Sequence, residues 1–268
     1  MPAKNYPEPS ARRFHAYNIG TAKSGTHSIA GIFQTGYRAA HEPAHWELIQ
    51  WLLQHKSRHK TSIDIGSHKK DYIYFAERDR RLNLELEASG PLSFVVNFLV
   101  TQFPQAKFIF TVRDCYSWLD SYINHQLNAH KRAEKYNYWW EYRDLCLCPD
   151  LFKHDKRAAM LADYELYPLD SYLRHWHQFN TAILKAVPEE RLLIVRTADI
   201  SRSIERIADF LSVDATTLDS SATHLFKAKQ KFHLLEKIDP DFLAQKTTYY
   251  CQPLMTEFFP EIRKWNDI

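Results

Sequence analysis

The segment Asn18-Ile-Gly-Thr-Ala-Lys-Ser-Gly-Thr-His-Ser-Ile29 decides the fold of this chain. It follows an apolar run, so we expect a short strand that leads into a turn of small residues and then into a helix. A turn with Gly20, Ser24 and Gly25 lets backbone N–H groups converge on one anion, and the N-terminus of the next helix adds about half a positive charge. Lys23 adds a full charge. The segment therefore predicts a phosphate-binding turn.

This turn differs from the GxxxxGK[ST] loop of nucleoside triphosphatases, because Lys23 precedes Gly25 instead of following it. Its order Lys-Ser-Gly-Thr resembles the 5′-phosphosulfate loop of the sulfotransferases that use 3′-phosphoadenosine 5′-phosphosulfate (PAPS), whose common form is Pro-Lys-Ser-Gly-Thr-Thr. Ala22 stands where Pro is usual, and His27 stands where the second Thr or Ser is usual. The resemblance implies that the phosphosulfate is bound by the residues of this turn, which are Lys23, Ser24, Gly25, Thr26, His27 and Ser28.

A second motif begins with the apolar run 108–112, which is typical of a strand buried on both faces. Arg113 stands at the end of this run, and Ser121 follows eight residues later. If Asp114 or Ser117 caps a helix, Ser121 lies about two turns along it and can face the strand end. An Arg and a Ser in these positions can share one phosphate. The pattern resembles the 3′-phosphate motif of the same family, which implies that Arg113 and Ser121 bind the 3′-phosphate.

The order of the elements indicates an α/β fold. Strands are expected at 14–19, 37–40, 108–112 and 191–196, and helices between them make parallel pairing and right-handed crossovers the expected topology. The resemblance implies the P-loop-like sulfotransferase fold, which has three layers with a central parallel β-sheet flanked by helices.

Three further features complete the expected organisation of the chain. The alternation of apolar and charged residues over 82–87 predicts one more strand, and residues 253–265 are expected to form a closing helix. With 268 residues and 45% hydrophobic content, the chain can bury one full core. We expect a flexible tail over 1–13 and a single domain over 14–268.

The composition excludes several classes of protein. A net charge of +3 is too small for a broad nucleic-acid-binding surface, so any preference for anions must be local. No run approaches the roughly 18 apolar residues of a membrane span, and the first residues lack an apolar signal core. We therefore expect a soluble, cytoplasmic protein with no membrane span. No CxxC pair occurs, so we expect free thiols and no metal site from the four cysteines, Cys115, Cys146, Cys148 and Cys251.

The resemblance also implies a reaction. A hydroxyl or amine attacks the sulfur of PAPS in line with the leaving 5′-phosphate oxygen, without a metal, and adenosine 3′,5′-bisphosphate (PAP) is the product. Lys23 would stabilise the charge that develops, and a base must take the acceptor proton. In cytosolic members the base is a His on the strand before the Arg strand; in tyrosylprotein and some heparan sulfotransferases it is a Glu.

The strand before the Arg strand holds two acidic residues and no His in this chain. Glu87 is the expected base, because it lies nearer the C-terminal end of the strand, where α/β sheets bind their ligands. Glu85 is the alternative. The histidines at 68, 27 and 125 are weaker candidates, the last two because they lie close to the nucleotide motifs.

Two regions leave alternatives open. In this family a late basic or glycine-containing loop folds over the nucleotide; Lys227, Lys229 and Lys231 are the candidates, although the usual Arg-Lys-Gly is absent and a solvated basic segment is equally compatible. The aromatic region 136–167 either lines the acceptor site or packs on the core. A small molecule, a carbohydrate or a lipid-like alcohol would suit it equally, and the oligomeric state is not readable.

Two other functions compete with sulfuryl transfer. A P-loop kinase or ATPase is suggested by the strand-turn-helix opening and by Asp114, which follows an apolar strand as a Walker B residue does. A nucleotide-binding module without turnover is suggested by His27 and by the absent Arg-Lys-Gly. Binding of ATP with Mg²⁺ would favour the kinase, and binding without turnover would favour the module.

Overall fold

The chain folds around a parallel sheet. The computed structural model describes residues 11–55, 69–133, 137–224 and 230–268. Within them the strands follow the order β2-β3-β1-β4-β5, and every pair of neighbours is parallel. The strands are β1 (Ala16–Ile19), β2 (Ala39–His41), β3 (Leu86–Ala88), β4 (Lys107–Val112) and β5 (Leu192–Arg196).

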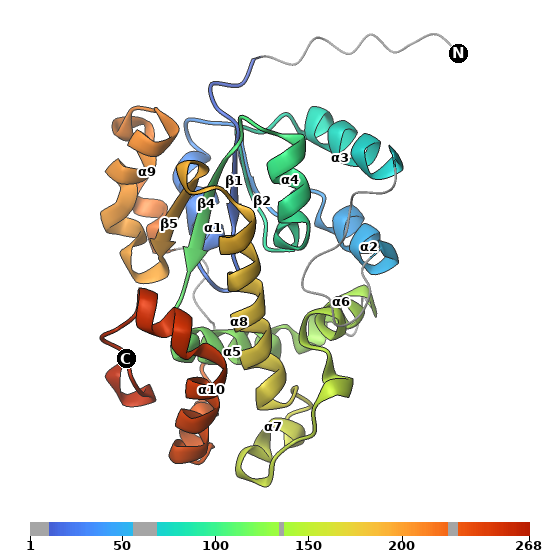
Figure 1. Ribbon diagram of the computed structural model, residues 1–268, viewed down its shortest axis with the longest axis vertical. Helices are drawn as coiled ribbons and strands as arrows, with labels where there is room; N and C mark the ends of the chain where they lie inside the picture. The colour runs from blue at the N-terminus through green and yellow to red at the C-terminus, as the bar shows by residue number, and fades with distance from the viewer. Residues whose placement is uncertain (1–10, 56–68, 134–136, 225–229) are drawn as a thin grey trace.

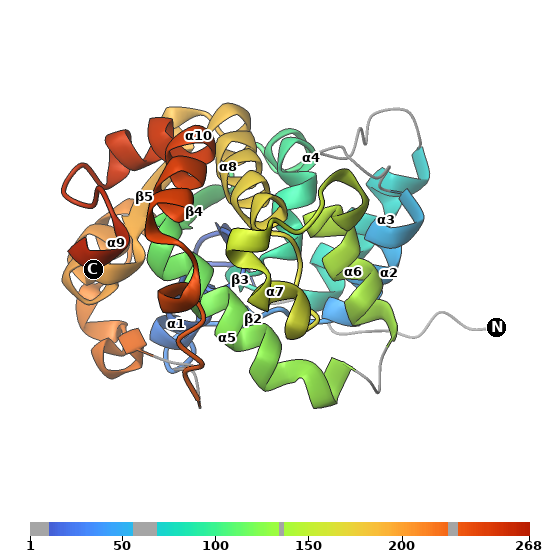
Figure 2. The same cartoon turned by 90° about the horizontal axis from the view of Figure 1, so that it is seen from below.

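Helices cover both faces of this sheet, so the predicted three-layer α/β fold is confirmed (Figure 1). Figure 2 shows α8 and α10 on one side of β4 and β5 and α1 on the other. The α-helices in the described ranges are α1 (Thr26–Phe33), α2 (His45–His55), α3 (Lys69–Leu82), α4 (Val96–Gln102), α5 (Cys115–Ala133), α6 (Asn137–Leu147), α7 (Met160–Asp163), α8 (Leu169–Ala186), α9 (Ile204–Leu211) and α10 (Pro240–Phe258).

Two apolar cores lie on opposite faces of the sheet. Strand β4 contributes to both, because Phe108 and Phe110 belong to the larger core while Ile109 belongs to the smaller one. The larger core also contains Trp118 of α5 and Trp176 of α8, and the smaller one is built from α1, α9 and their neighbours. This alternation explains why the sequence of β4 reads as a continuous apolar run.

The structure corrects three boundaries. Helix α3 continues to Leu82 and ends where Asn83 adopts a left-handed φ of 44°, so β3 is shorter than the expected strand over 82–87. The closing helix begins at Pro240 instead of 253, because Asp239 caps it by accepting the N–H of Phe242 at 2.7 Å. The last residues of the expected tail are held: Arg12 pairs with Asp79 and Arg13 with Glu85.

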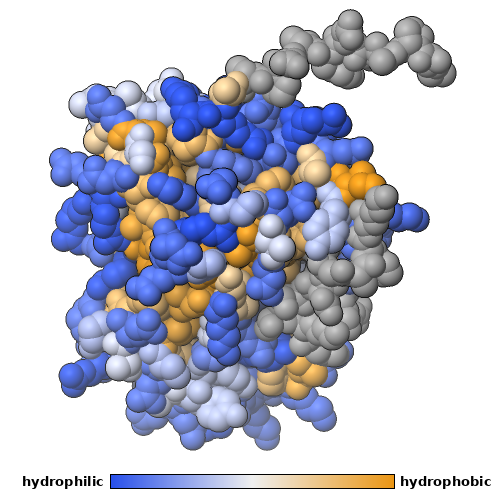
Figure 3. All heavy atoms as spheres, turned by 45° about the horizontal axis from the view of Figure 1, so that its top comes forward, coloured by the Kyte–Doolittle hydropathy of each residue, from blue (hydrophilic) through white to orange (hydrophobic). Residues whose placement is uncertain are grey.

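The face of the molecule drawn in Figure 3 is mostly hydrophilic. Figure 3 shows blue side chains over most of one face, with apolar atoms in a broken band in the left half of the view and in smaller spots elsewhere. No helix in the described ranges combines the length and the apolar character needed to cross a membrane.

The parallel arrangement brings five strand ends to one edge of the sheet. The residues that directly follow β1, β2, β3, β4 and β5 are Gly20, Glu42, Ser89, Arg113 and Thr197. Ligands of open α/β sheets bind at this C-terminal edge. Both predicted phosphate motifs therefore lie at the edge where such a ligand is expected.

Candidate functional site

The turn between β1 and α1 has a shape that requires its glycines. Gly25 has a φ of 103°, and a Cβ there would lie 2.6 Å from Cδ1 of Ile200. A Cβ at Gly20 would lie 2.5 Å from the backbone oxygen of Thr111. Lys23 also has a left-handed φ, at 71°. The backbone of the turn therefore closes on itself beside the N-terminus of α1, in the way that anion-binding turns do.

Side chains from three other elements hold the carbonyl groups of this turn. The carbonyls of 22–24 accept hydrogen bonds from these side chains, which fixes the orientation of the turn beside the start of α1, whose first N–H groups have no acceptor within the helix. The donors are Trp118 Nε1 to Ala22 O at 2.9 Å, Arg113 Nη1 to Lys23 O at 3.5 Å and Thr197 Oγ1 to Ser24 O at 2.5 Å.

The hydroxyl side chains of the turn have separate roles. The Ser24 hydroxyl is buried and lies 3.2 Å from Oγ1 of Thr111 in β4, so this hydroxyl faces the sheet. Thr26 Oγ1 lies 3.2 Å from Nε2 of His41. Ser28 lies in the first turn of α1 and is buried.

Two histidines flank the turn. The rings of His27 and His41 are 4.5 Å apart. Burial lowers the pKa of His41 to about 4, and the neighbouring His27 adds to this shift. Burial and Lys23 also lower the pKa of His27. Both imidazoles are therefore neutral at pH 7, so they offer hydrogen bonds to a ligand and no charge.

Lys23 and Arg113 form a pair of neighbouring cations. Burial and then Arg113 lower the pKa of Lys23 to about 8, and burial lowers the pKa of Arg113. Within the described residues Arg113 makes no ion pair with a carboxylate, and its hydrogen bonds go to the Lys23 carbonyl and to Oγ of Ser117, which is 2.9 Å from Nε. Two half-buried cations in this arrangement favour an anion between or beside them.

Helix α5 presents hydroxyl groups to Arg113. Asp114 caps this helix, accepting the Ser117 N–H at 2.8 Å and the Ser117 hydroxyl. Ser121 lies four residues after Ser117, so it shares the helix face on which Ser117 meets Arg113. The carbonyl of Arg113 is itself held by Trp176 Nε1 at 3.0 Å. Arg113 thus contacts Ser117, and Ser121 lies one turn further along the same helix face.

The segment after the late basic loop docks on the same helix. Lys227 and Lys229 lie outside the described residues. Asn128 donates to Gln230 O at 2.9 Å, and the N–H of Phe232 donates to Asn124 at 2.8 Å. Burial raises the pKa of Asp120, and the charges of Lys231 and Arg113 oppose this rise, so both cations lie near the same carboxyl.

Glu87, the expected base, is occupied elsewhere. Its carboxylate receives two hydrogen bonds from Arg78, of 2.7 and 2.6 Å, and both side chains are buried. Arg78 also donates to the carbonyl of Pro43 at 2.9 Å. This geometry gives Glu87 a structural partner under the sheet edge and argues against proton transfer to it.

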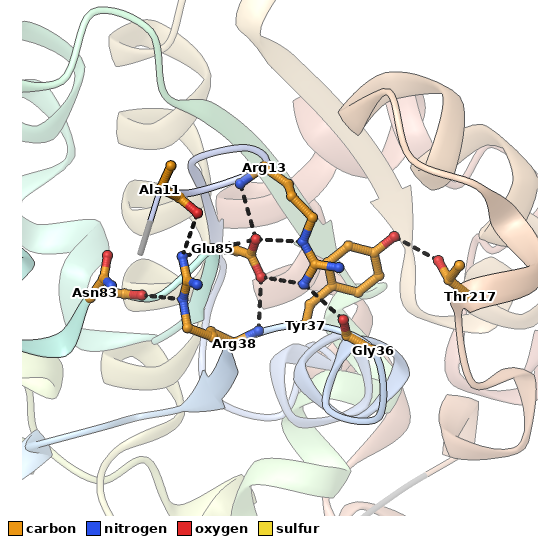
Figure 4. Close-up of polar contacts among 8 residues, drawn as sticks. All are labelled: Ala11, Arg13, Gly36, Tyr37, Arg38, Asn83, Glu85 and Thr217. Atoms are coloured by element: carbon orange, nitrogen blue, oxygen red, sulfur yellow. Dashed lines mark hydrogen bonds and ion pairs between the residues drawn. The ribbon is translucent and has the colours of Figure 1, made fainter. Parts of the chain in front are cut away.

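Glu85 lies at the opposite end of its strand from the phosphate motifs. Figure 4 shows its carboxylate between Arg13 and the backbone N–H of Arg38. The Arg13 guanidinium donates at 2.7 Å and holds the pKa of Glu85 down at about 2. Glu85 directly precedes β3, at the end of the strand away from the C-terminal edge, and it anchors the segment before β1.

Glu42 is the carboxylate that the sequence reading missed. It directly follows β2, and its backbone N–H donates to Ala88 O at 2.8 Å. Burial raises the pKa of this partly exposed side chain to about 7, although the Gly90 N–H bonds to it and favours the ionised form. A Cβ at Gly90 would lie 3.7 Å from Glu42 Oε1 and 3.8 Å from Ala22 N, so the carboxylate and the turn flank the same small residue.

Aromatic side chains from the predicted acceptor region lie next to Glu42. Burial raises the pKa of Tyr142 on α6, and Glu42 is among the charges that add to this rise. The ring of Trp139 stacks on His45 with centroids 5.6 Å apart, and that of Tyr138 meets Trp46 at 4.5 Å. Part of the region 136–167 thus packs on α2 through aromatic contacts, while Tyr167 packs in the core.

A sulfotransferase domain model matches residues 18–219 of this chain. The chain belongs to the sulfotransferase family. A search of curated proteins by sequence gave no match.

Solved structures similar to this sulfotransferase are themselves sulfotransferases of low sequence identity. The enzyme STF9 from Mycobacterium avium is 13% identical, with a TM-score of 0.49 over 94% of this chain and 78% of that one. A sulfotransferase from Alicyclobacillus acidocaldarius is 11% identical, with a TM-score of 0.47 over 92% and 97%. Mouse SULT7A1, solved with PAP, is 14% identical, with a TM-score of 0.43 over 93% and 85%.

Three further residues were singled out in the sequence of this sulfotransferase: His68, His125 and Asp114. Position 68 lies outside the described residues, and His125 lies on α5, past Ser121. The Asp114 carboxylate caps α5 by accepting hydrogen bonds from Ser117, which is a different role from that of a Walker B residue. The four cysteines are buried thiols, and no group of three metal-ligating side chains occurs in the described ranges.

One rule would have found Glu42 from sequence. In a parallel sheet the residue that follows each strand lies at the ligand-binding edge, and Glu42 is the acidic residue in that position after β2.

Proposed function

We propose that this sulfotransferase uses PAPS as its donor and transfers the sulfuryl group to a hydroxyl or amine of a small-molecule, carbohydrate or lipid-like acceptor, releasing PAP. The observation that carries this proposal is the pair of cationic sites at neighbouring strand ends. Lys23 and the N-terminus of α1 suit a phosphosulfate, and Arg113 with Ser117 and Ser121 suits a separate phosphate.

The residues of the turn bind and neutralise one end of the donor. When bound, PAPS supplies the sulfuryl group and the phosphate oxygen that leaves with the S–O bond electrons. Lys23 is mostly protonated at pH 7, since its pKa is about 8. Together with the N–H groups at the start of α1, it would stabilise the charge on that leaving oxygen.

Glu42 is the proposed general base. As the acceptor oxygen forms its bond to sulfur, the proton of that hydroxyl passes to the Glu42 carboxylate. A pKa of about 7 suits a base that works near neutral pH, and the partly exposed side chain is reachable by an acceptor. Glu87 and Glu85 are both held by arginines, so neither competes for this role.

Calorimetry tests the donor site. PAP, AMP and ATP with Mg²⁺ are titrated into the protein in the absence of other metals. We expect PAP to bind far more tightly than AMP, because only PAP has the 3′-phosphate for Arg113 and Ser121. Equal affinity for PAP and AMP, or a preference for ATP with Mg²⁺, would overturn the proposal. Transfer of radiolabelled sulfate from PAPS to a panel of acceptors then separates an enzyme from a binding module.

A further inference from the structure

Arg143 on α6 is a buried cation without an anionic partner. The residue is 7% exposed, and no hydrogen bond or ion pair of its guanidinium occurs with any other described residue. Its Nη1 is buried and has no acceptor among the described residues. The ring of Trp140 lies with its centroid 5.0 Å from the guanidinium. The contrast is Arg78, which is equally buried and makes two bonds to Glu87.

A second unsatisfied donor lies in the same region. Gln126 of α5 is 1% exposed, its Oε1 accepts the hydroxyl of Tyr172, and its Nε2 has no acceptor among the described residues. Burial raises the pKa of Tyr172, and the charge of Arg143 opposes that rise, so Arg143 also lies near this tyrosine. A buried guanidinium without a partner costs several kcal/mol. A ligand with anionic oxygens would remove this cost.

This region is joined to the sulfuryl-transfer site by one face of α5. Trp118, Tyr122 and Gln126 are spaced by four residues, so they lie on one side of the helix. Trp118 holds the Ala22 carbonyl of the turn, and its ring stacks on Tyr122 with centroids 5.1 Å apart. From Trp118 to Gln126 the helix rises about 12 Å.

Helix α6 also connects the surroundings of Glu42 with Arg143. Tyr142, the neighbour of Glu42, directly precedes Arg143. Burial raises the pKa of Tyr122, and the positive charge of Arg143 lowers it. The guanidinium therefore lies near Tyr122 as well. Tyr142 thus lies near Glu42, and Tyr122 lies near Arg143.

We propose that Arg143, with the Gln126 amide, binds an anionic group of the acceptor. The inference rests on the proposed function and names its substrate class: an acceptor with a hydroxyl or amine at one end, an apolar or aromatic body, and a carboxylate, sulfate or phosphate at the other. Such a group satisfies the guanidinium by charge-assisted hydrogen bonds, which a neutral acceptor of the same shape does not.

Matched ligands test this binding site without any need for turnover. The probes are 4-(4-hydroxyphenyl)butanoate, its neutral amide and the corresponding sulfonate and phosphonate, each titrated by calorimetry into the protein with and without saturating PAP. We expect the carboxylate to bind at least about tenfold more tightly than the amide, the ratio given by one charge-assisted hydrogen bond. The sulfonate and phosphonate show which anion fits best.

Variants assign the preference to one residue. Arg143→Met should reduce the ratio of acid to amide affinity to about one, and Arg143→Lys should retain part of it. The control Arg81→Met removes an exposed arginine paired with Glu47 and should leave the ratio unchanged. Equal affinity of wild type for acid and amide, no binding by any probe, or an unchanged ratio in Arg143→Met would overturn the proposal. PAP affinity, measured in the same samples, reports on the donor site separately.

Thermal unfolding adds a readout that is independent of ligands. Because Arg143 has no anionic partner among the described residues, removal of its charge should leave the melting temperature of Arg143→Met unchanged or higher. A lower melting temperature in both Arg143→Met and Arg143→Lys would show that the guanidinium stabilises the fold, and the proposal would then fail.

Discussion

Replacement of Glu42 by Gln should abolish the acidic limb of the pH profile of sulfuryl transfer. With a pKa of about 7, only about one tenth of the Glu42 side chains are ionised one pH unit below that value. The wild-type kcat/KM should therefore fall about tenfold per pH unit under pH 7. Lys23, with a pKa of about 8, should produce the alkaline limb, because its neutral form no longer stabilises the leaving oxygen.

Initial rates measure this profile. Radiolabelled sulfate is transferred from PAPS to an acceptor identified by screening, at low acceptor concentration, from about pH 5 to about pH 10. Glu42→Gln should lose about 100-fold to 10,000-fold in kcat, which is the usual contribution of a general base, while PAP affinity stays close to that of wild type. Retention of most activity, or of the acidic limb, in Glu42→Gln would refute the assignment.

Stability provides an independent measure of the same pKa. The raised value means that the folded state favours the protonated carboxyl, so the stability present below the ordinary value of 4.5 is lost as pH rises through about 7. A difference of about 2.5 pH units corresponds to about 3 kcal/mol. Urea unfolding at about pH 8 should therefore find Glu42→Gln more stable than wild type.

Glu87→Gln is the matched comparison. This change removes one partner of a buried ion pair with Arg78, so about 3–5 kcal/mol of stability should be lost. The variant should be destabilised at pH 8, where Glu42→Gln gains stability. If the folded Glu87→Gln protein lost its turnover and Glu42→Gln kept it, the two roles would have to be exchanged.

Three further predictions concern other residues. Arg113→Ala should weaken PAP binding by about 100-fold and AMP binding far less, since one bidentate phosphate contact is lost; calorimetry with both nucleotides checks this, and equal losses would remove the 3′-phosphate assignment. Gly25→Ala should distort the turn, because its φ is 103° and Ile200 lies where the Cβ would be; we expect weaker PAP binding and a lower melting temperature, and an unchanged melting temperature would contradict the geometry. The carboxyl of Glu85 has a depressed pKa of about 2, so its stabilising effect should be present above about pH 4.5 and be lost as pH falls toward 2; urea unfolding of wild type and Glu85→Gln should therefore differ at pH 7 and converge in acid, and a constant difference would exclude this origin.

The turn after β1 and the central strands were readable from sequence for physical reasons. The turn after β1 needs glycine where φ is positive, and β4 is buried on both faces, so both leave a pattern in the chain. Glu42, the proposed base, was missed because the rule of strand ends needs the true end of β2. This strand has three residues, too few to show alternation, and it ends at His41 instead of at the expected residue 40.

The pairing of Glu87 with Arg78 was not predicted from sequence for a related reason. The alternation over 82–87 combines the last residue of α3 with a strand that begins at Leu86, so its period of two does not come from one strand. The partner of Glu87, Arg78, lies one helix earlier, and nothing in the sequence pairs the two before the fold does. Arg143 is buried without an anionic partner among the described residues. This is likewise a property of the packed helices and not of a sequence motif.

The turn after β1 is fixed from outside itself. Trp118, Arg113 and Thr197 hold its carbonyl groups, and they come from parts of the chain about 90 to 170 residues further on. The anion site is thus a property of the assembled sheet edge, in which the short segment 18–29 supplies the surface and distant residues supply its shape. A graft of those residues onto another strand-turn-helix unit, without the three donors, would carry the whole motif and no working site.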